Sequence, residues 1–550
     1  MLTPSAWLLI TSCLSIAMPE GMSPIGCGCS RRSDGRKGRN LVVNLDGTSN
    51  QYGTNNTNVI ELFSRIAASN EQLKYYNSGI GTYARPSWRS WGYAKQIMEN
   101  WVDLAIANFE TVLIGAYRWL SDQYQEGDRI FLFGFSRGAY QVRALAGMIE
   151  KIGLIHRGNE EQIPFAYELY ADDSVTKDKA AHFKKTFSVK NVRVHFIGVW
   201  DSVSSIGLVR GAELPLVGSC DHVCVFRHAL ALDECRVKFM PECMARPDRP
   251  LPLNAKEVWF PGSHSDVGGG LLPNDELNLQ SIPLLWMERE ALFAGLHLQQ
   301  SNIGSWEIRH LELEVPFDSL GRFSGWRILE YLPIPRESPT NPSRVTWLPH
   351  FCEGRSILPG QKIHASIAFR QESYAPIASF YKHAASEKTP PNWGDIVGRG
   401  QAGQFRNIDG WEDILELDIF DASVVPHLLD RLQEEEFNEE NRMSILDHLR
   451  FLNSLPEIDH SMRMGILRNL PVEELVAMLH TADCVLAAET LSKLANTVDA
   501  RATINMAGGI GILVNMLSGG NSRSAALVLQ ALMRHGWFHI HLKASLRASS

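Results

Sequence analysis

The sequence has few cysteines, and none of them shows the spacing of a disulfide scaffold or a zinc module. Nine cysteines are scattered through 550 residues without a CxxC pair, and an odd, scattered set gives no disulfide framework. Cys220, His222, Cys224 and His228 lie close in sequence but lack the paired spacing of a zinc site. We therefore expect ordinary thiols and imidazoles there, with no metal and no organic cofactor.

An excess of positive charge is also missing. The chain carries 53 Lys and Arg against 61 Asp and Glu, a formal net charge of -8. Such a balance gathers no phosphates, so it argues against nucleic acid as the main partner. Apolar residues make up 45% and charged residues 21%, as in ordinary globular proteins. The length predicts more than one domain.

No long hydrophobic run occurs near the start of the chain. The apolar stretch 7–18 is too short to span a bilayer and lacks the basic residues that precede the core of a signal peptide. A small, polar and basic run follows at 31–39. We expect residues 1–38 to be a disordered leader and the protein to be cytoplasmic. The alternative is a weak secretion signal and a secreted protein.

Short apolar runs alternate with helical patterns in the first part of the chain. The runs at 41–45, 129–133, 192–200 and 257–260 each end in a polar or glycine-containing turn, and helical patterns cover 104–124 and 138–152. This alternation predicts an α/β domain over 39–400, with helices on both faces of a mostly parallel sheet. In such sheets the chemistry gathers beyond the carboxyl ends of the strands.

The composition becomes leucine-rich and helical from about residue 409. The segment 475–479 recurs at 513–517, and an Ala-Ala-Leu-Leu pattern at 487–494 recurs at 525–532, both offset by thirty-eight positions. A helical repeat of this length indicates a solenoid, and its sequence looks like an armadillo repeat, with a blurred further unit at 428–455. We therefore predict an armadillo-like all-α region over 409–550. Binding of a protein partner through its concave surface is one interpretation, and helices that lean on the catalytic domain are the other.

A strand, a sharp turn and a helix surround the motif Gly134-Phe135-Ser136-Arg137-Gly138. In this context a GxSxG motif indicates a nucleophile held clear of its neighbours, and the glycines leave room for the strained turn. Ser136 is our candidate nucleophile. A small-residue turn or a helix cap is the alternative interpretation.

Two further side chains complete a candidate triad. Asp201 follows the run 192–200, and His264 follows the run 257–260, which gives the chain order Ser, Asp, His of the α/β-hydrolases. His264 would take the proton of Ser136, and Asp201 would orient the imidazole. Asp266 and Asp233 are alternative acids, and His264 has the simpler alternative of a turn histidine bonded to backbone.

An oxyanion hole needs two donors near the nucleophile. We expect one from the backbone N–H of Arg137, the residue after Ser136, and another from the turn Asp46-Gly47-Thr48 after the first strand. Asp46 itself is expected to orient that turn rather than to react.

Six motifs together resemble an uncharacterised α/β-hydrolase family that includes the phospholipase effectors of bacterial type VI secretion. They are 45–50 (LDGTSN), 75–82 (YYNSGIGT), 134–139 (GFSRGA), 199–203 (VWDSV), 228–234 (HALALDE) and 261–270 (PGSHSDVGGG). The resemblance covers about 41–370 and implies a lipolytic Ser136, Asp201 and His264 site. One departure is Cys235, which stands where the family has an arginine.

The sequence as a whole favours an ester hydrolase that acts on an acyl lipid or another carboxylic ester through an acyl-serine intermediate. A transient membrane surface is an expected partner, and the aromatic and basic segment 85–93 is a candidate lid, or else packs over the core. The alternative from another class is an inactive hydrolase fold that serves as a scaffold through its repeats.

Overall fold

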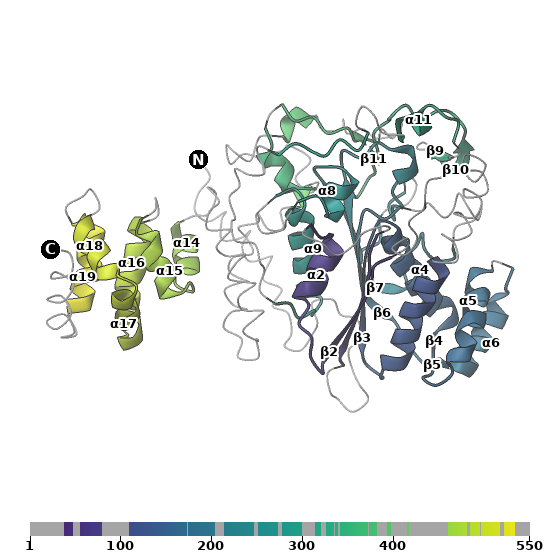
Figure 1. Ribbon diagram of the computed structural model, residues 1–550, viewed down its shortest axis with the longest axis horizontal. Helices are drawn as coiled ribbons and strands as arrows, with labels where there is room; N and C mark the ends of the chain where they lie inside the picture. Colours follow the sequence, from purple (N-terminus) through teal and green to yellow (C-terminus); the bar gives the residue numbers. More distant parts are fainter. Residues whose placement is uncertain are drawn as a thin grey trace, which may run out of the picture. The chain divides into compact units, whose positions relative to one another are not determined.

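The computed structural model divides the chain into two compact units, Met1–Asp418 and Ile419–Ser550 (Figure 1). It describes residues 38–47, 55–79, 109–172, 174–203, 214–246, 251–272, 278–299, 314–320, 326–334, 336–338, 341–371, 373–381, 393–397, 415–416, 460–480, 484–495, 497–517 and 522–533. The expected leader before residue 38, the candidate lid at 85–93 and the blurred repeat at 428–455 lie outside these ranges.

The first unit is built on an eight-stranded sheet in the order β14-β12-β8-β7-β6-β3-β1-β2. Every neighbouring pair in that order is parallel. The prediction of an α/β fold with a mostly parallel sheet is confirmed. The strands are β1 (Asn40–Leu45), β2 (Gln72–Asn77), β3 (Arg129–Phe135), β6 (Val194–Trp200), β7 (Val223–Ala231), β8 (Ala255–Phe260), β12 (Lys362–His364) and β14 (Leu415–Glu416). Since β14 belongs to the sheet, the sheet extends past residue 409, where we expected the helical region to begin.

Helices cover both faces of this sheet (Figure 1). On one face lie α4 (Arg137–Ile152) and the helical residues 109–123, with α5 (Ile163–Ala171) and α6 (Lys177–Phe187) packed outside α4. On the other face lie α2 (Asn58–Arg65) and α9 (Ser281–Phe293). The strands are apolar on both sides because helices bury both, as parallel sheets require.

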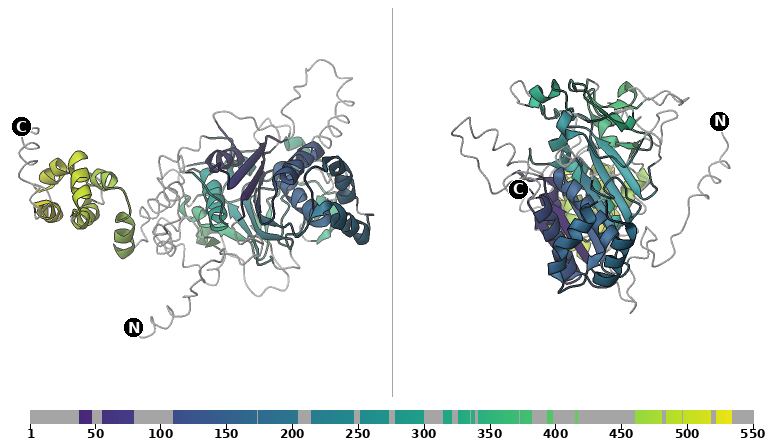
Figure 2. Two further views of the ribbon diagram at one scale, coloured as in Figure 1. Left: turned by 90° about the horizontal axis from the view of Figure 1, so that it is seen from below. Right: turned by 90° about the vertical axis from the view of Figure 1, so that its right-hand side faces the viewer.

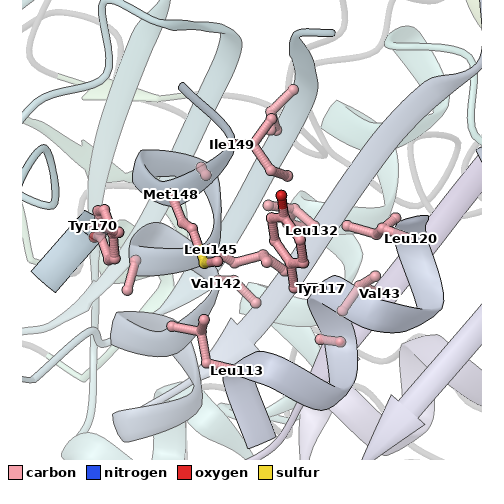
Figure 3. Close-up of a cluster of buried hydrophobic side chains, with 14 of the residues drawn as sticks. Val43, Leu113, Tyr117, Leu120, Leu132, Val142, Leu145, Met148, Ile149 and Tyr170 are labelled. Atoms are coloured by element: carbon pink, nitrogen blue, oxygen red, sulfur yellow. The ribbon is translucent and has the colours of Figure 1, made fainter. Parts of the chain in front are cut away.

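A cluster of fully buried side chains holds α4 against the sheet (Figure 3). Val43 of β1 and Leu132 of β3 meet Val142 and Leu145 of α4, while the Tyr117 hydroxyl donates to the Gly153 carbonyl at 2.6 Å. Each large apolar side chain buried in this way stabilises the fold by about 1.5–3 kcal/mol. The cluster therefore fixes the start of α4, where the candidate nucleophile lies.

Short elements gather at the carboxyl end of the sheet, above the strands in Figure 1 and at the top of the right-hand view of Figure 2. They are η3 (Val237–Phe239), α8 (His264–Gly268), α11 (Trp326–Glu330), β9 (Arg336–Ser338), β10 (Asn341–Thr346), β11 (Ser356–Ile357), η4 (Ala365–Phe369), β13 (Ser379–Phe380) and η5 (Trp393–Asp395). Elsewhere, β4 (Leu154–Ile155) pairs with β5 (Ser188–Val189), and η2 (Glu160–Gln162) precedes α5.

The second unit is helical in its described residues. Its helices are α14 (His460–Leu467), α15 (Val472–Met478), α16 (Cys484–Leu494), α17 (Val498–Met506), α18 (Gly509–Met516) and α19 (Ser522–Met533). Leu475 of α15 and Leu513 of α18 are both fully buried, as are Ala487 of α16 and Ala525 of α19. The repeated residues thus occupy equivalent buried positions of two helix pairs. The armadillo class of the repeat stays a prediction.

No helix in the described part of the chain is both long enough and apolar enough to cross a bilayer.

Candidate active site

Ser136 lies at the junction of β3 and α4 in a backbone conformation that is rare for a side-chain-bearing residue. Its φ is 57° and its ψ is -122°, and only 7% of its surface is exposed. The two flanking glycines allow the tight turn: a Cβ on Gly134 would meet the Gly138 carbonyl oxygen at 2.6 Å, and one on Gly138 would meet the Leu45 carbonyl oxygen at 2.2 Å. The strand-turn-helix context expected for a nucleophile is therefore present.

The structure brings the three predicted triad residues together. The His264 Nε2 atom lies 2.9 Å from the Ser136 Oγ, and its Nδ1 atom lies 2.5 Å from Asp201 Oδ2. The imidazole is packed between the rings of Phe135 and Phe239, with centroid separations of 4.7 and 4.8 Å. His264 is thus a side chain bonded at both nitrogens to the other two candidates, and it is not a turn histidine bonded to backbone.

Strand register explains why residues far apart in the sequence meet. Phe135 of β3 pairs with Trp200 of β6, so Ser136 and Asp201 both leave the sheet at the same level. Ala231 of β7 pairs with Phe260 of β8, after which α8 begins at His264. The carboxyl ends of parallel strands share one edge, and the three side chains converge there.

The Asp201 carboxylate is fully buried and has a partner that sequence reasoning missed. Arg355 donates from Nη1 to Oδ1 at 2.6 Å and from Nη2 to Oδ2 at 2.9 Å, and the Ala231 N–H donates to Oδ1 at 3.2 Å. Burial alone would raise the pKa of Asp201, but the Arg355 guanidinium and His264 hold it well below its ordinary value. The lowered pKa keeps Asp201 ionised at neutral pH.

The two alternative acids have other partners. Asp233 accepts from the Gly262 N–H at 2.7 Å and from the Tyr374 hydroxyl at 2.6 Å. Asp266 accepts from the N–H and the hydroxyl of Ser263, at 2.7 and 2.9 Å, in a capping box at the start of α8. Burial raises the pKa of both carboxyls. Both shape the loop that carries His264, and Asp201 is the carboxylate bonded to the imidazole.

The Asp46 carboxylate orients the turn after β1. Its Oδ2 atom accepts from the Thr57 hydroxyl at 2.7 Å and from the Tyr76 hydroxyl at 3.1 Å. Burial, together with the charge of Asp46, raises the pKa of Tyr76, which therefore stays protonated as a donor. A Cβ on Gly79 would meet the Asp46 carbonyl oxygen at 2.4 Å, so the chain after β2 packs directly on this turn.

The expected oxyanion donors are only partly supported. The Gly47 N–H donates to Oδ1 of the preceding residue, Asp46, at 2.6 Å. The Asp46 N–H donates to the Asn77 carbonyl at 3.0 Å. Both donors are thus engaged within the turn, and Thr48 lies outside the described residues. The Arg137 N–H occupies the first position of α4, where a helix offers it no internal acceptor. Its role stays a prediction.

The motif at 228–234 supports the loops that carry the triad. His228 accepts from the Ser202 N–H at 3.1 Å through Nε2, and its Nδ1 lies 3.1 Å from Glu257 Oε1. At the other end, Glu234 accepts from the His264 N–H at 3.3 Å and from the Arg236 guanidinium at 2.8 Å. Sequence reasoning named this motif but did not foresee these contacts.

The cysteine and histidine cluster at 220–228 shows no metal geometry. Cys220 and Cys224 are buried, and His228 is bonded to Glu257. Among the described residues, no group of three or more His, Cys, Asp and Glu side chains is arranged to hold a metal ion.

Comparisons with known proteins find one family model and one curated relative. A model of the catalytic domain of Tle1-like phospholipase effectors of the type VI secretion system matches residues 39–290. An uncharacterized protein of Saccharomyces cerevisiae is 35% identical over 240 residues, which cover 41% of this chain and 35% of that protein. The chain therefore spans about a third of the length of this yeast relative.

Two solved structures are also similar in part. The Tle1 effector bound to the VgrG spike of the type VI secretion system matches at 20% identity and a TM-score of 0.24, over 42% of this chain and 51% of the other. An uncharacterized protein from Pseudomonas aeruginosa matches at 16% identity and a TM-score of 0.32, over 90% of this chain and 77% of the other. Ser136, Asp201 and His264 all fall within the segment that the family model matches, and Arg355 follows it. Residues 39–290 are thus similar to the catalytic domains of Tle1-like phospholipase effectors.

Proposed function

We propose that this protein is a serine hydrolase that cleaves carboxylic esters of acyl lipids. The observation that carries the proposal is the chain of hydrogen bonds from Ser136 Oγ through His264 to Asp201, at 2.9 and 2.5 Å. Side chains in this order supply a nucleophile, a base and a group that orients the base, which acyl transfer requires. The match of residues 39–290 to the phospholipase effector model favours a lipid over other esters.

The first half of the reaction forms an acyl-enzyme. His264 Nε2 takes the proton of the Ser136 hydroxyl as Oγ attacks the ester carbonyl, and the carbonyl electron pair moves onto oxygen. The N–H of Arg137 is the proposed donor to that oxyanion. When the carbonyl re-forms, the bond to the leaving alcohol breaks, and His264 returns its proton to the alcohol oxygen.

The second half releases the acid. Water, deprotonated by His264, attacks the acyl carbon, and the Ser136 oxygen leaves with the returned proton. In both halves the imidazole becomes positively charged, and the adjacent ionised Asp201 stabilises that charge. The low pKa of Asp201 suits this role because the carboxylate does not take the proton itself.

An exposed apolar surface beside the site supports a lipid substrate. Its members come from α11 and the following chain and from the segment after β10, namely Ile328, Tyr331, Leu332, Trp347, Leu348 and Phe351, which are 67, 59, 44, 62, 70 and 64% exposed. Tyrosine and tryptophan favour the boundary between water and lipid. The Tyr331 and Phe351 rings lie in contact, with centroids 5.8 Å apart, so exposed side chains of the two segments are neighbours.

Hydrogen bonds join this apolar surface to the wall of the site. The buried Glu330 carboxylate accepts from His350 Nδ1 at 2.7 Å and from the Val237 N–H at 2.7 Å. Val237 begins η3, whose last residue, Phe239, packs on the His264 ring. The chain segment that carries the apolar surface is thus linked, through Glu330 and η3, to the residue that packs on the His264 ring.

Labelling with a fluorophosphonate probe tests the chemistry. We expect the probe to modify Ser136, because its hydroxyl is bonded to a base, and we expect S136A and H264A to abolish labelling. The variant S64A is the control, since Ser64 is exposed on α2 and bonds only to a nearby carbonyl in the described residues. Folded protein that resists labelling would refute the hydrolase proposal and favour a scaffold.

Vesicle binding tests the lipid part of the proposal separately. We expect the combined variant W347A/L348A/F351A to lose most of its partition onto phosphatidylcholine vesicles, because it removes large apolar side chains, each worth about 1.5–3 kcal/mol when buried. Hydrolysis of a soluble short-chain ester should persist, since none of the three touches the triad. Unchanged vesicle binding and lipid hydrolysis in this variant would contradict a docking role for the surface.

A further inference from the structure

A residue outside the matched family segment makes a two-bond ionic contact with Asp201. Arg355 is 2% exposed and grips both oxygens of the Asp201 carboxylate, at 2.6 and 2.9 Å. A planar guanidinium matches a carboxylate in this two-bond geometry, which fixes the carboxylate plane as well as its position. Both Arg355 and His264 therefore contact Asp201 Oδ2. The two bonds from Arg355 hold the Asp201 carboxylate in the orientation that faces the imidazole.

The anchoring of Arg355 keeps its own position fixed. Its Nη1 also donates to the Ala231 carbonyl at 3.2 Å, its Nη2 donates to the Phe239 carbonyl, and the Ser379 N–H donates to its backbone carbonyl at 2.9 Å. A Cβ on the preceding Gly354 would meet the Ile377 carbonyl oxygen at 2.0 Å, so this loop is tightly packed. The guanidinium is thus held by Ala231 of β7, by Phe239 of η3 and by Asp201 itself.

We propose that Arg355 is a positioning residue of the catalytic site, which aligns Asp201 with His264 and keeps the carboxylate charged. This inference rests on the proposed hydrolase function. Arg355 touches neither the nucleophile nor the substrate carbonyl, so its effect on the reaction passes through Asp201.

A consequence is expected in the acid range. Burial favours the protonated form of Asp201, and Arg355 is the main group that opposes it. Several titratable groups face this pair in the described residues. They are His264 and His228 on the side of Asp201, and Glu234 and Cys243 on the side of Arg355. Without the guanidinium, the carboxylate would take up a proton at a higher pH and would no longer stabilise the imidazolium.

The test compares R355M and R355K in the full-length protein, with R65M as control because Arg65 is also buried and pairs with Glu288 at 2.8 Å away from the triad. We expect R355M to lower kcat on a soluble ester with little change in KM, by less than the roughly 10⁴-fold cost of losing a triad carboxylate. The acid limb of its kcat profile should lie at a higher pH than in the wild type, because the Asp201 carboxylate would be protonated more readily. R355K should recover part of the activity, because it keeps the charge.

A double-variant comparison separates positioning from support of the fold. If Arg355 acts through Asp201, then D201N and D201N/R355M should have the same residual kcat per labelled site. A pH-independent loss in R355M, an unmoved acid limb and additive effects in the double variant would together overturn the proposal and leave Arg355 a structural brace.

Proton NMR provides a readout that needs no activity. A strong bond between Asp201 and His264 should give a downfield imidazole N–H signal in the wild type, absent in H264Q and shifted or lost in R355M. If that signal responds to R355M while no ester is cleaved, the positioning holds and the hydrolase function fails. If it does not respond in a protein that does cleave esters, the positioning role fails instead.

Discussion

At the scale of single residues, Ser136 has a strained backbone conformation, which is unfavourable for any residue that has a Cβ atom. Its φ of 57° with a ψ of -122° lies in a region that glycine adopts far more readily than other residues. Residues held in such regions cost about 1–3 kcal/mol and cluster at functional sites. Asp201, with a φ of 41°, is a second example in the same site.

This strain predicts that S136G stabilises the protein while abolishing ester hydrolysis. Glycine reaches the required conformation without the Cβ clash, so we expect a gain of about 1 kcal/mol in the free energy of unfolding. Thermal unfolding of the catalytic unit measures it. The control S136A keeps the Cβ and should lose activity without the gain, and equal stability of the two variants would contradict the argument.

Single residues also show what the sequence was able to predict. Ser136, Asp201 and His264 were identifiable because each directly follows an apolar strand, and parallel strands end at one edge. Arg355 was not identifiable, because it lies 154 residues from its partner in a loop with no motif. The bond from the Gly47 N–H to the Asp46 carboxylate was not foreseeable either, because sequence does not reveal it, and the oxyanion donor of that turn stays a prediction.

At the scale of elements, the fit of α4 against β1 depends on the absence of a side chain at Gly138. A Cβ there would meet the Leu45 and Asp46 carbonyl oxygens at 2.2 and 2.5 Å, and neither backbone atom is free to rotate away. The contact explains why the turn after β1 and the turn before α4 are neighbours. Sequence indicated both turns as parts of one site but not that they touch.

We therefore predict that G138A displaces α4 and is destabilising by about 1–3 kcal/mol, with a lower rate of fluorophosphonate labelling. Thermal unfolding and labelling kinetics measure the two effects. The matched control is G511A in α18, where a Cβ meets nothing and alanine should stabilise the helix slightly. If G138A unfolded and reacted with the probe like the wild type, α4 would be able to shift with no loss of stability, and the prediction would be wrong.

The repeats show a different limit of sequence reasoning at this scale. The offset of thirty-eight positions identified equivalent helices, because residues that occupy the same buried position of two repeats tend to be of the same type. Ala487 and Ala525 are such a pair, and both are fully buried. It did not locate the end of the sheet, since a two-residue strand such as Leu415–Glu416 has no periodicity to detect.

At the scale of the whole molecule, buried ion pairs couple the stability of the catalytic unit to pH. Glu290 of α9 is paired with Arg227 of β7 and with Lys256 of β8, the latter at 2.8 Å. Burial would raise the pKa of Glu290, but the two cations lower it from 4.5 to about 2. The pairs tie the helix layer to two strands of the sheet.

A carboxyl with a lowered pKa stabilises the fold above its unfolded pKa and loses that contribution as pH falls through the folded value. For Glu290 the contribution is about 3 kcal/mol at neutral pH and is lost between about pH 4.5 and pH 2. We predict that E290Q unfolds at a lower temperature than wild type at pH 7 and that the difference shrinks toward pH 2.

Calorimetry at several pH values measures this difference. The exposed Glu160 provides the control E160Q, which should follow the wild-type curve throughout. A constant gap between E290Q and wild type at every pH would mean that packing, and not charge, is what Glu290 contributes.

The distance along the chain between Ser136 and His264, 128 residues, has a consequence for protein synthesis. A ribosome completes the nucleophile turn long before it makes the base, and later still the arginine that aligns the acid. Contacts of such long range form late in folding. If the protein is the hydrolase that we propose, a nascent chain therefore cleaves no ester at its full rate until Arg355 has been translated and has reached Asp201.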